Sequence, residues 1–160
     1  MDIFAGSGSV GIESLSRGAT HCTFVDLSQN CCETIQRNLD TLGVEASTTI
    51  VCGDALRVLR EPASFGLTEP YQVVTICPPY EEVVYADLLE AVANSPLLQE
   101  DTIVLLEYPV ELGCLPHVVP PTLVGIRNRK YGRTVIAMYI NNPTGKLELA
   151  DSRPEEFVEV

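Results

Sequence analysis

A glycine pattern near the start of the chain leaves few choices of fold. Gly6-x-Gly8-x-x-Gly11 follows a short apolar stretch at residues 2–5 and precedes a helix-like run at about residues 9–17. Glycines at this spacing allow a tight turn between a strand and a helix, and they let a ligand approach the helix N-terminus closely. The pattern therefore predicts a strand–turn–helix unit that binds a ligand, and it is compatible with several ligands.

Strand-like and helix-like segments alternate after this turn. Apolar runs predict further strands at residues 21–26, 48–55, 71–77 and 101–109. Apolar stripes at helical spacing are formed by Cys31, Ile35, Leu39 and Leu42, and by Tyr85, Leu88, Leu89 and Val92. The run at 71–77 is apolar enough to be buried on both faces, as in a parallel sheet.

The last strand-like segment differs from the others. Residues 123–140 contain two strand-like runs around a basic turn near Tyr131 and Gly132, which predicts an antiparallel hairpin. The chain as a whole is thus expected to be α/β, with a mostly parallel, doubly wound, Rossmann-like sheet and a C-terminal hairpin. Ligands of such sheets bind beyond the carboxyl ends of the strands.

The charge of the chain is strongly negative and unevenly spread. The formal net charge of −12 argues against a nucleic-acid partner, because phosphate binding needs Lys and Arg. Four of the ten basic residues, however, lie in one run: Arg127, Arg129, Lys130 and Arg133. This run is either a solvated hairpin or a phosphate-binding site. Residues 1–141 are expected to form the domain, and residues 142–160 an acidic, flexible tail.

The spacing of the cysteines argues against a metal-binding protein, and the lack of long apolar runs argues against a membrane-spanning protein. The six cysteines form no C-x-x-C pair and have no histidine pair nearby, so we expect no metal site. No stretch reaches the roughly 18 apolar residues of a membrane span, and no membrane partner is expected. We predict an intracellular monomer.

Two ligands compete for the glycine turn. Asp26 lies 20 residues after Gly6, where an acid would bind ribose hydroxyls of a nicotinamide or flavin dinucleotide, and of other adenosine cofactors as well. Asp2 disfavours a pyrophosphate, because two negative groups would repel, and it could accept from a cationic amine. Asp54 could accept from an exocyclic amine. The run Cys77-Pro78-Pro79-Tyr80 has no role in hydride transfer.

These motifs in this order resemble the class I S-adenosylmethionine-dependent methyltransferases. Within that class the chain is similar to the RsmD-like family, which methylates the exocyclic N2 of a guanine in small-subunit rRNA, and most closely to its plant and algal plastid branch. The resemblance implies small-subunit rRNA or a pre-ribosomal particle as partner, in the cytoplasm of a bacterium or in the chloroplast stroma of a plant or alga. The family has residues before the glycine strand, so the domain is expected to be N-terminally incomplete.

The resemblance also implies the site residues. The cofactor, S-adenosylmethionine, would be bound by Asp2, Phe4, Ala5, Gly6, Ser7, Gly8, Asp26, Leu27, Asp54 and Ala55. The catalytic group would be Cys77, Pro78, Pro79 and Tyr80, with Tyr80 stacking on a guanine extruded from its helix. RNA would be bound by Arg127, Arg129, Lys130 and Arg133.

Cys77 departs from the family pattern, which has Asn or Asp at this position. A thiol is a weak hydrogen-bond acceptor for the target amine, so either activity is retained or Cys77 is a buried thiol in a weakened site. A nucleophilic cysteine of the pyrimidine C5 type is a third alternative. The substrate could also be a DNA adenine or a protein glutamine, or the protein could be a non-catalytic cofactor-binding or ribosome-assembly protein.

Overall fold

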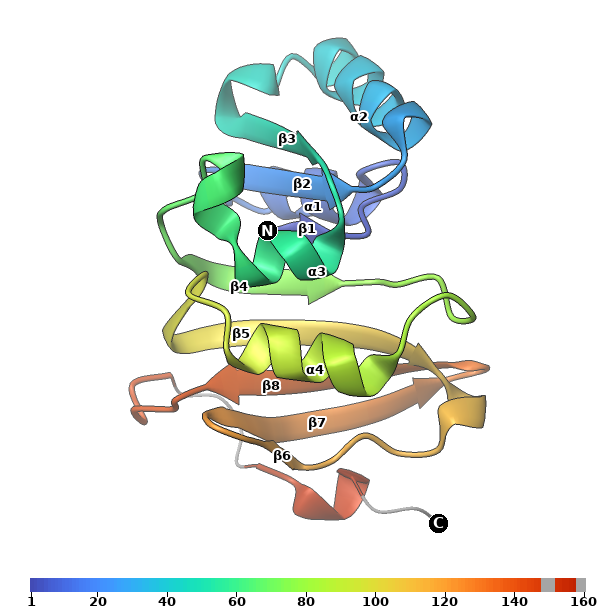
Figure 1. Cartoon of the computed structure of the whole chain (residues 1–160), viewed down its shortest axis with the longest axis vertical. Coiled ribbons are helices and arrows are strands. Elements are labelled where there is room, and N and C mark those ends of the chain that lie inside the picture. The colour runs from blue at the N-terminus through green and yellow to red at the C-terminus, as the bar shows by residue number, and fades with distance from the viewer. Residues whose placement is uncertain (148–151, 158–160) are drawn as a thin grey trace.

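The structure is a computed structural model that describes residues 1–147 and 152–157. These residues form one eight-stranded sheet with the strand order β3-β2-β1-β4-β5-β8-β7-β6, which runs from top to bottom in Figure 1. The parallel strands are β1 (Asp2–Ile3), β2 (Cys22–Asp26), β3 (Thr48–Cys52), β4 (Tyr71–Ile76) and β5 (Leu98–Pro109). The antiparallel strands are β6 (Val118–Val119), β7 (Leu123–Tyr131) and β8 (Thr134–Asn141). The predicted fold class is confirmed.

Helices cover both faces of this sheet. The helices are α1 (Ser9–Ser16), α2 (Gln29–Leu42), α3 (Ala55–Arg60) and α4 (Tyr85–Ala93), with 3₁₀ turns η1 (Glu45–Ser47), η2 (Pro62–Phe65), η3 (Val110–Leu112) and η4 (Pro154–Phe157). In Figure 1, α3 and α4 lie in front of the sheet and α1 lies behind it. Two apolar clusters result: a large one that includes side chains of α3 and α4, and a smaller one between α1, α2 and β2.

Packing against β2 explains why the third position of the glycine pattern, Gly11, is a glycine. A Cβ atom at this position would lie 2.3 Å from Cε1 of Phe24 and 2.7 Å from Sγ of Cys22, both on β2. Any side chain would therefore push α1 away from the sheet. Gly11 is needed for close packing of helix on strand, whereas Gly6 and Gly8 have positive φ values of 56° and 79° and shape the turn.

Helix α2 shows how local signals and packing combine. Its N-terminus is capped by Ser28, whose side-chain oxygen accepts from the N–H of Cys31 at 3.4 Å, and it ends at Gly43 with a φ of 67°. The predicted apolar face was partly wrong. Cys32, not Cys31, is buried with Ile35 and Leu39, and Leu42 is 55% exposed. Residues 32, 35 and 39 face the sheet at helical spacing, whereas Leu42 lies in the last turn, beyond that contact.

The prediction that β4 is buried on both faces was also wrong. Val74 and Ile76 are buried toward α3 and α4, but Gln72 and Val73 are exposed, and Val73 keeps 41% of its surface. The other face of β4 at Val73 borders a surface hollow of about 500 Å³ instead of a helix. Apolar composition favoured burial of the strand, but only the neighbouring elements determine which face is covered.

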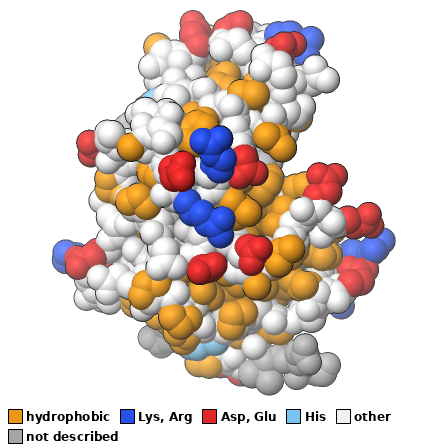
Figure 2. Space-filling view, viewed as in Figure 1, with side chains coloured by type: hydrophobic (Ala, Val, Ile, Leu, Met, Phe, Trp, Pro, Cys, Tyr) orange, Lys and Arg blue, Asp and Glu red, His pale blue; other side chains and the backbone are white. Residues whose placement is uncertain are grey.

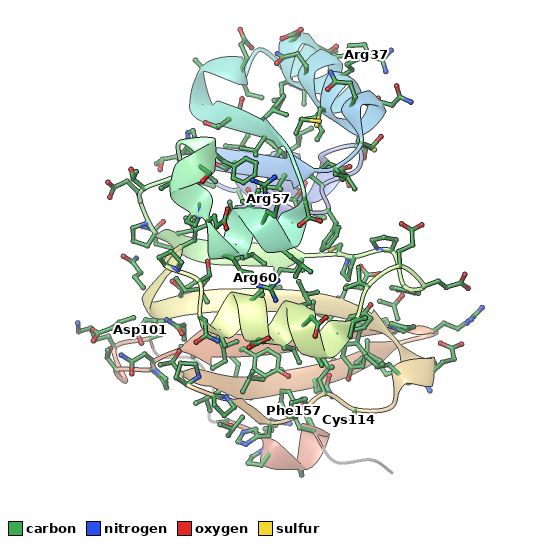
Figure 3. The ribbon with its side chains drawn as sticks, in the orientation of Figure 1. Arg37, Arg57, Arg60, Asp101, Cys114 and Phe157 are labelled. Atoms are coloured by element: carbon green, nitrogen blue, oxygen red, sulfur yellow. The ribbon has the colours of Figure 1, made fainter. Side chains whose placement is uncertain are left out.

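The described part of the C-terminal segment packs on the antiparallel half of the sheet. The aromatic ring of Phe157 is buried against Gly125 of β7, and Figure 3 shows it close to Cys114. The N–H of Asn128 donates to Oε2 of Glu156 at 2.9 Å. The predicted flexible tail, residues 142–160, falls partly on residues 148–151 and 158–160, which lie outside the described residues, so its flexibility stays a prediction.

Candidate functional site

The loops after the parallel strands meet at the carboxyl edge of the sheet, and Asp26 joins two of them. Its Oδ2 accepts from the N–H of Gly6 at 2.8 Å, and its Oδ1 accepts from the N–H of Ser28 at 2.9 Å. The glycine turn and the loop after β2 are therefore held by one carboxylate. Asp26 keeps part of its surface exposed, so further donors can reach its oxygens.

The glycine turn itself leaves open space. A Cβ built at Gly6 would meet no atom within 4 Å, and the N–H of Gly8 donates to the carbonyl of Ala5 at 2.7 Å to close the turn. Phe4 also has a positive φ of 60°. The carbonyl of Ser7 accepts from Asn38 of α2 at 2.9 Å. The turn is thus ordered by its own hydrogen bonds and presents free volume at Gly6.

Asp2 lies beneath the turn. It is only 2% exposed, its Oδ2 accepts from the N–H of Gly11 at 2.9 Å, and its Oδ1 accepts from the hydroxyl of Thr75 at 2.8 Å. Burial raises the pKa of this carboxyl, and these two hydrogen bonds act against that shift. In this structure Asp2 connects β1, α1 and β4, and its role toward a cofactor amine stays a prediction.

The loop after β3 supplies another acid beside an exposed apolar residue. Asp54 caps α3, because its Oδ1 accepts from the N–H of Arg57 at 2.8 Å, and Ala55 behind it is buried. Across the edge, Leu27 follows β2 and is 70% exposed. The carboxylates of Asp26 and Asp54 thus lie on the loops after β2 and β3, and the first of these loops also carries exposed Leu27.

The motif after β4 is attached to β5 and β8 through Tyr80. Its hydroxyl donates to Oε1 of Glu107 at 2.5 Å and lies 2.8 Å from Oγ1 of Thr134. Pro78 is buried and Pro79 is exposed. Glu107 was missed in the sequence, although it is the single acid within the apolar part of the run 103–108, a signal that could have indicated it.

Cys77 lies beside Glu107, and its thiol has a raised pKa. Burial, together with hydrogen bonding to Glu107 and the nearby charge of Asp2, raises the pKa of Cys77 to about 12. A thiol with this pKa carries almost no thiolate at neutral pH, and thiolate is the nucleophilic form. The raised pKa of Cys77 therefore disfavours the nucleophilic-cysteine alternative.

Tyr85, at the start of α4, also belongs to this neighbourhood. Its hydroxyl is buried and, among the described residues, has no hydrogen-bond partner. Burial raises the pKa of Tyr85 to about 12, with Tyr80, Glu107 and Cys77 contributing. Tyr80 and Tyr85 line a hollow of about 620 Å³ that extends to Arg133. Of the motif, only Tyr80 lines this hollow.

The four basic residues of the predicted RNA site lie on the hairpin of β7 and β8. Among the described residues, Arg133 is paired with Glu111 at 2.7 Å and Arg129 with Glu156 at 4.0 Å. Arg127 is half-buried and Lys130 is exposed. The hairpin lies at the edge that also carries Tyr80, because Thr134 of β8 contacts the Tyr80 hydroxyl.

Two further findings concern the described residues only. Within residues 1–147 and 152–157, no group of three or more His, Cys, Asp or Glu side chains is arranged to hold a metal ion. None of the helices in this part of the chain has the length and apolar character needed to cross a membrane.

The open sheet with antiparallel strands at one end, and the acids and Pro-Pro-Tyr motif on its carboxyl edge, define the class: a class I methyltransferase. The chain matches the family described as Conserved hypothetical protein 95 over residues 1–140. It therefore belongs to that family, the RsmD-like methyltransferases. Family membership decides between the two ligands of the glycine turn in favour of the methyltransferase cofactor.

Individual relatives agree with this assignment. The candidate rRNA methyltransferase YlbH of Bacillus subtilis is 36% identical over 139 residues, which cover 87% of this chain and 73% of YlbH. Ribosomal RNA small subunit methyltransferase D of Escherichia coli K12 is 25% identical over 146 residues, 91% of this chain and 70% of that protein. These relatives are bacterial, so the likeness to the plastid branch stays a prediction.

Solved structures show the same fold. A conserved hypothetical protein of Streptococcus pyogenes superposes with a TM-score of 0.75 at 28% identity and covers 88% of this chain and 85% of its own. The candidate methyltransferase yhhF of Escherichia coli superposes with a TM-score of 0.74 at 26% identity. The match covers 88% of this chain and 74% of the yhhF chain.

Proposed function

We propose that this protein transfers a methyl group from S-adenosylmethionine to the exocyclic N2 of a guanine in small-subunit rRNA, either free or in a pre-ribosomal particle. The observation that carries the proposal is the arrangement of four loops on one edge of the sheet: the glycine turn, Asp26, Asp54 and the motif from Cys77 to Tyr80. The relatives named as rRNA methyltransferases support the substrate class.

The residues fit the adenosine part of the cofactor. Asp26 has carboxylate oxygens for ribose hydroxyls, and Gly6 leaves room for the ligand beside it. Exposed Leu27 offers an aliphatic surface to the adenine ring, and Asp54 offers an acceptor for the adenine amine, next to Ala55. Phe4, Ala5, Ser7 and Gly8 would shape the turn around the methionine part, with Asp2 beneath it.

S-adenosylmethionine, when bound, supplies an electrophilic methyl group on a sulfonium. The protein must hold the guanine N2 in line with that methyl group, and most of the rate gain comes from positioning and electrostatics. In the transfer the N2 lone pair would form the N–C bond, the electron pair of the C–S bond would stay on sulfur, and one N2 proton would pass to solvent. The carbonyl of Pro78 and the sulfur of Cys77 would accept the N2 hydrogens and orient the lone pair.

Tyr80 would hold the extruded base. Its hydroxyl is fixed by Glu107 and Thr134, which leaves the ring as a flat surface at the end of β4. Aromatic rings bind unstacked bases face to face. Pro79, which is exposed beside it, limits the space in which the base can move.

A second function is favoured by Cys77. A protonated thiol in place of an amide or carboxylate weakens acceptance from the target amine. A non-catalytic role in ribosome assembly would tolerate that change. DNA adenine and protein glutamine remain alternative substrates, because their amines also suit a Pro-Pro-Tyr site.

Single-turnover methylation of small-subunit rRNA from a strain lacking the modification tests the proposal. Mass spectrometry of the digested RNA should find N2-methylguanine when the chain and S-adenosylmethionine are both present. Methylation of DNA or protein in place of rRNA would change the proposed substrate class. A deletion strain that assembles small subunits poorly but keeps every rRNA methyl group would favour the assembly role.

Calorimetry with S-adenosylmethionine tests the cofactor site separately. Asp26→Ala should weaken binding by about 1.5–3 kcal/mol, the range for hydrogen bonds to a charged group. Asp40→Ala, which removes an exposed acid from α2, serves as the matched control. An unchanged affinity of the Asp26 variant would exclude it as the ribose ligand.

A further inference from the structure

Glu107 is a half-buried carboxylate at the target-base site. Among the residues that the structure describes, it forms no salt bridge with Lys, Arg or His. Its partners are the hydroxyl of Tyr80 at 2.5 Å and the thiol of Cys77. Charges withdrawn from water are normally paired with a cation, and Glu107, which is half-buried, meets only neutral donors among the described residues.

Strand register places Glu107 next to the methyl-acceptor motif. Ile76 of β4 pairs with Leu106 of β5, and both side chains are buried on the same face. Side chains alternate along a strand, so Cys77 and Glu107, the next residues, point together to the opposite face. Glu107 is thus brought to Cys77 by sheet pairing and not by proximity in sequence.

Glu107 also has acceptor capacity left. An ionised carboxylate offers about four lone-pair sites on two oxygens, and the hydroxyl of Tyr80 occupies one of them. The bond from Tyr80, which is itself held by Thr134, orients the carboxylate toward the motif. An oriented carboxylate selects a ligand edge that carries adjacent hydrogen-bond donors.

We propose that Glu107 accepts the N1–H and one N2–H of the target guanine, and so selects guanine and holds its amine for methylation. This proposal rests on the proposed function. Guanine is the one standard base whose Watson–Crick edge has two adjacent donors. Adenine and cytosine place an acceptor next to their amine, which a carboxylate repels, and uracil has no amine.

The charge of Glu107 supports base recognition over backbone binding. RNA phosphates are negative, so an unpaired acid near the substrate disfavours the backbone. The free-energy cost of an unpaired acid near RNA is offset only if the acid accepts hydrogen bonds. The guanine edge provides the donors for these bonds. The amine has two hydrogens: Pro78 would accept one, and Glu107 would share the other with Cys77, so the weak acceptor Cys77 needs to supply less.

A substrate swap tests the proposal with the full chain. The target guanine is first identified in rRNA from the methylation product of the wild type. Two RNA fragments are then made, one with guanine and one with 2-aminopurine at that position; 2-aminopurine keeps the amine but has an acceptor at N1. Glu107→Gln keeps the size and can still accept from Tyr80, but presents one acceptor and one donor.

The wild type should methylate the guanine fragment faster than the 2-aminopurine fragment. Glu107→Gln should lose roughly 10- to 100-fold on guanine and should prefer 2-aminopurine, because its amide matches that edge. S-adenosylmethionine affinity should stay within about twofold. Glu100→Gln, the same change on the exposed end of β5, is the matched control and should behave as the wild type.

The outcomes separate the two proposals. Absence of N2-methylguanine with the wild type overturns the proposed function. Methylation by the wild type, with no change in rate or base preference in Glu107→Gln, overturns the role of Glu107 alone. Thermal melting checks that the variant folds; if it does not, Glu107→Asp, which keeps the charge, should retain the guanine preference at a lower rate, and loss of that preference would contradict the proposal.

Discussion

The hydroxyl of Tyr85 is buried and, within the described residues, has no hydrogen-bond partner. An unsatisfied buried hydroxyl costs about 1–3 kcal/mol. Tyr85→Phe removes that group and should raise the free energy of unfolding by about 1 kcal/mol, measured by urea denaturation.

Tyr108 is the natural control for this change. It lies in contact with Tyr85, with ring centroids 6.3 Å apart, but its hydroxyl donates to Oδ1 of Asn128 at 2.9 Å. Tyr108→Phe should therefore lower the free energy of unfolding by about 1 kcal/mol. If both variants are destabilised equally, the Tyr85 hydroxyl has a partner in solution.

Cys77 is the residue whose chemistry limits the proposed reaction most directly. In Cys77→Asn the amide nitrogen can donate to Glu107, and the amide oxygen can accept from the guanine N2. A better hydrogen bond in the transition state is worth about 1 kcal/mol, so the single-turnover rate should rise roughly five- to tenfold.

Cofactor affinity should hardly change in this variant, since the contact is to the base. Cys31→Asn, on α2 and away from the motif, is the control. If Cys77→Asn and Cys77→Ser are both inactive, then the thiol is chemically required. The assignment of Cys77 as an amine acceptor would then be wrong.

The hairpin of β7 and β8 is the element expected to bind RNA. Its ion pair between Arg133 and Glu111 is on the surface, with side chains 84% and 54% exposed, and such pairs contribute little. An RNA phosphate can therefore replace Glu111 as the partner of Arg133 with little loss of protein stability. Arg129, paired with Glu156 at 4.0 Å, is similarly available.

Replacing the hairpin cations with Ser should lower RNA affinity and its salt dependence. The substituted residues are Arg127, Arg129, Lys130 and Arg133. Each lost phosphate contact should reduce the slope of log affinity against log salt by about 0.7–0.9. The control removes four charges elsewhere: Arg17, Arg37, Arg57 and Arg60, three of which Figure 3 labels on α2 and α3. Equal effects of both sets would make the hairpin an ordinary solvated turn.

The whole molecule is an acidic protein for which we propose an RNA substrate. Its net charge is −12, and on the face shown in Figure 2 the basic side chains over α3 and α4 lie beside acidic ones. Arg57 lies 3.9 Å from Glu61, and Arg60 lies 4.0 Å from Glu90. Cations on this face are thus offset locally, so we expect RNA binding to depend on the hairpin edge.

This charge predicts opposite effects of salt on folding and on binding. Salt screens the repulsion within the free protein, so raising the ionic strength from about 0.01 M to about 0.2 M should increase stability by about 1 kcal/mol, or roughly 2–4 °C in Tm. RNA affinity should fall over the same range. Chloride and acetate salts should act alike, and a Tm that falls with salt would contradict the prediction.

Much of the fold follows from signals that extend over a few residues. The glycine turn, the stripe from Tyr85 to Val92 and the turn at Gly132 were all predicted and are present. These features depend on backbone conformations and on the periods of helix and strand, which are local properties. Fold class and family could therefore be inferred before any contact was known.

Burial and the composition of the site depend on partners far away in the chain. Cys31 and Leu42 were expected in the core but lie outside it, because the position of α2 on the sheet determines which of its residues are covered. Glu107 reaches Cys77 only through the register of β4 and β5, across 30 residues of sequence. Local spacing carries no information on that register, and so the acid at the centre of the proposed base site emerged from the tertiary structure.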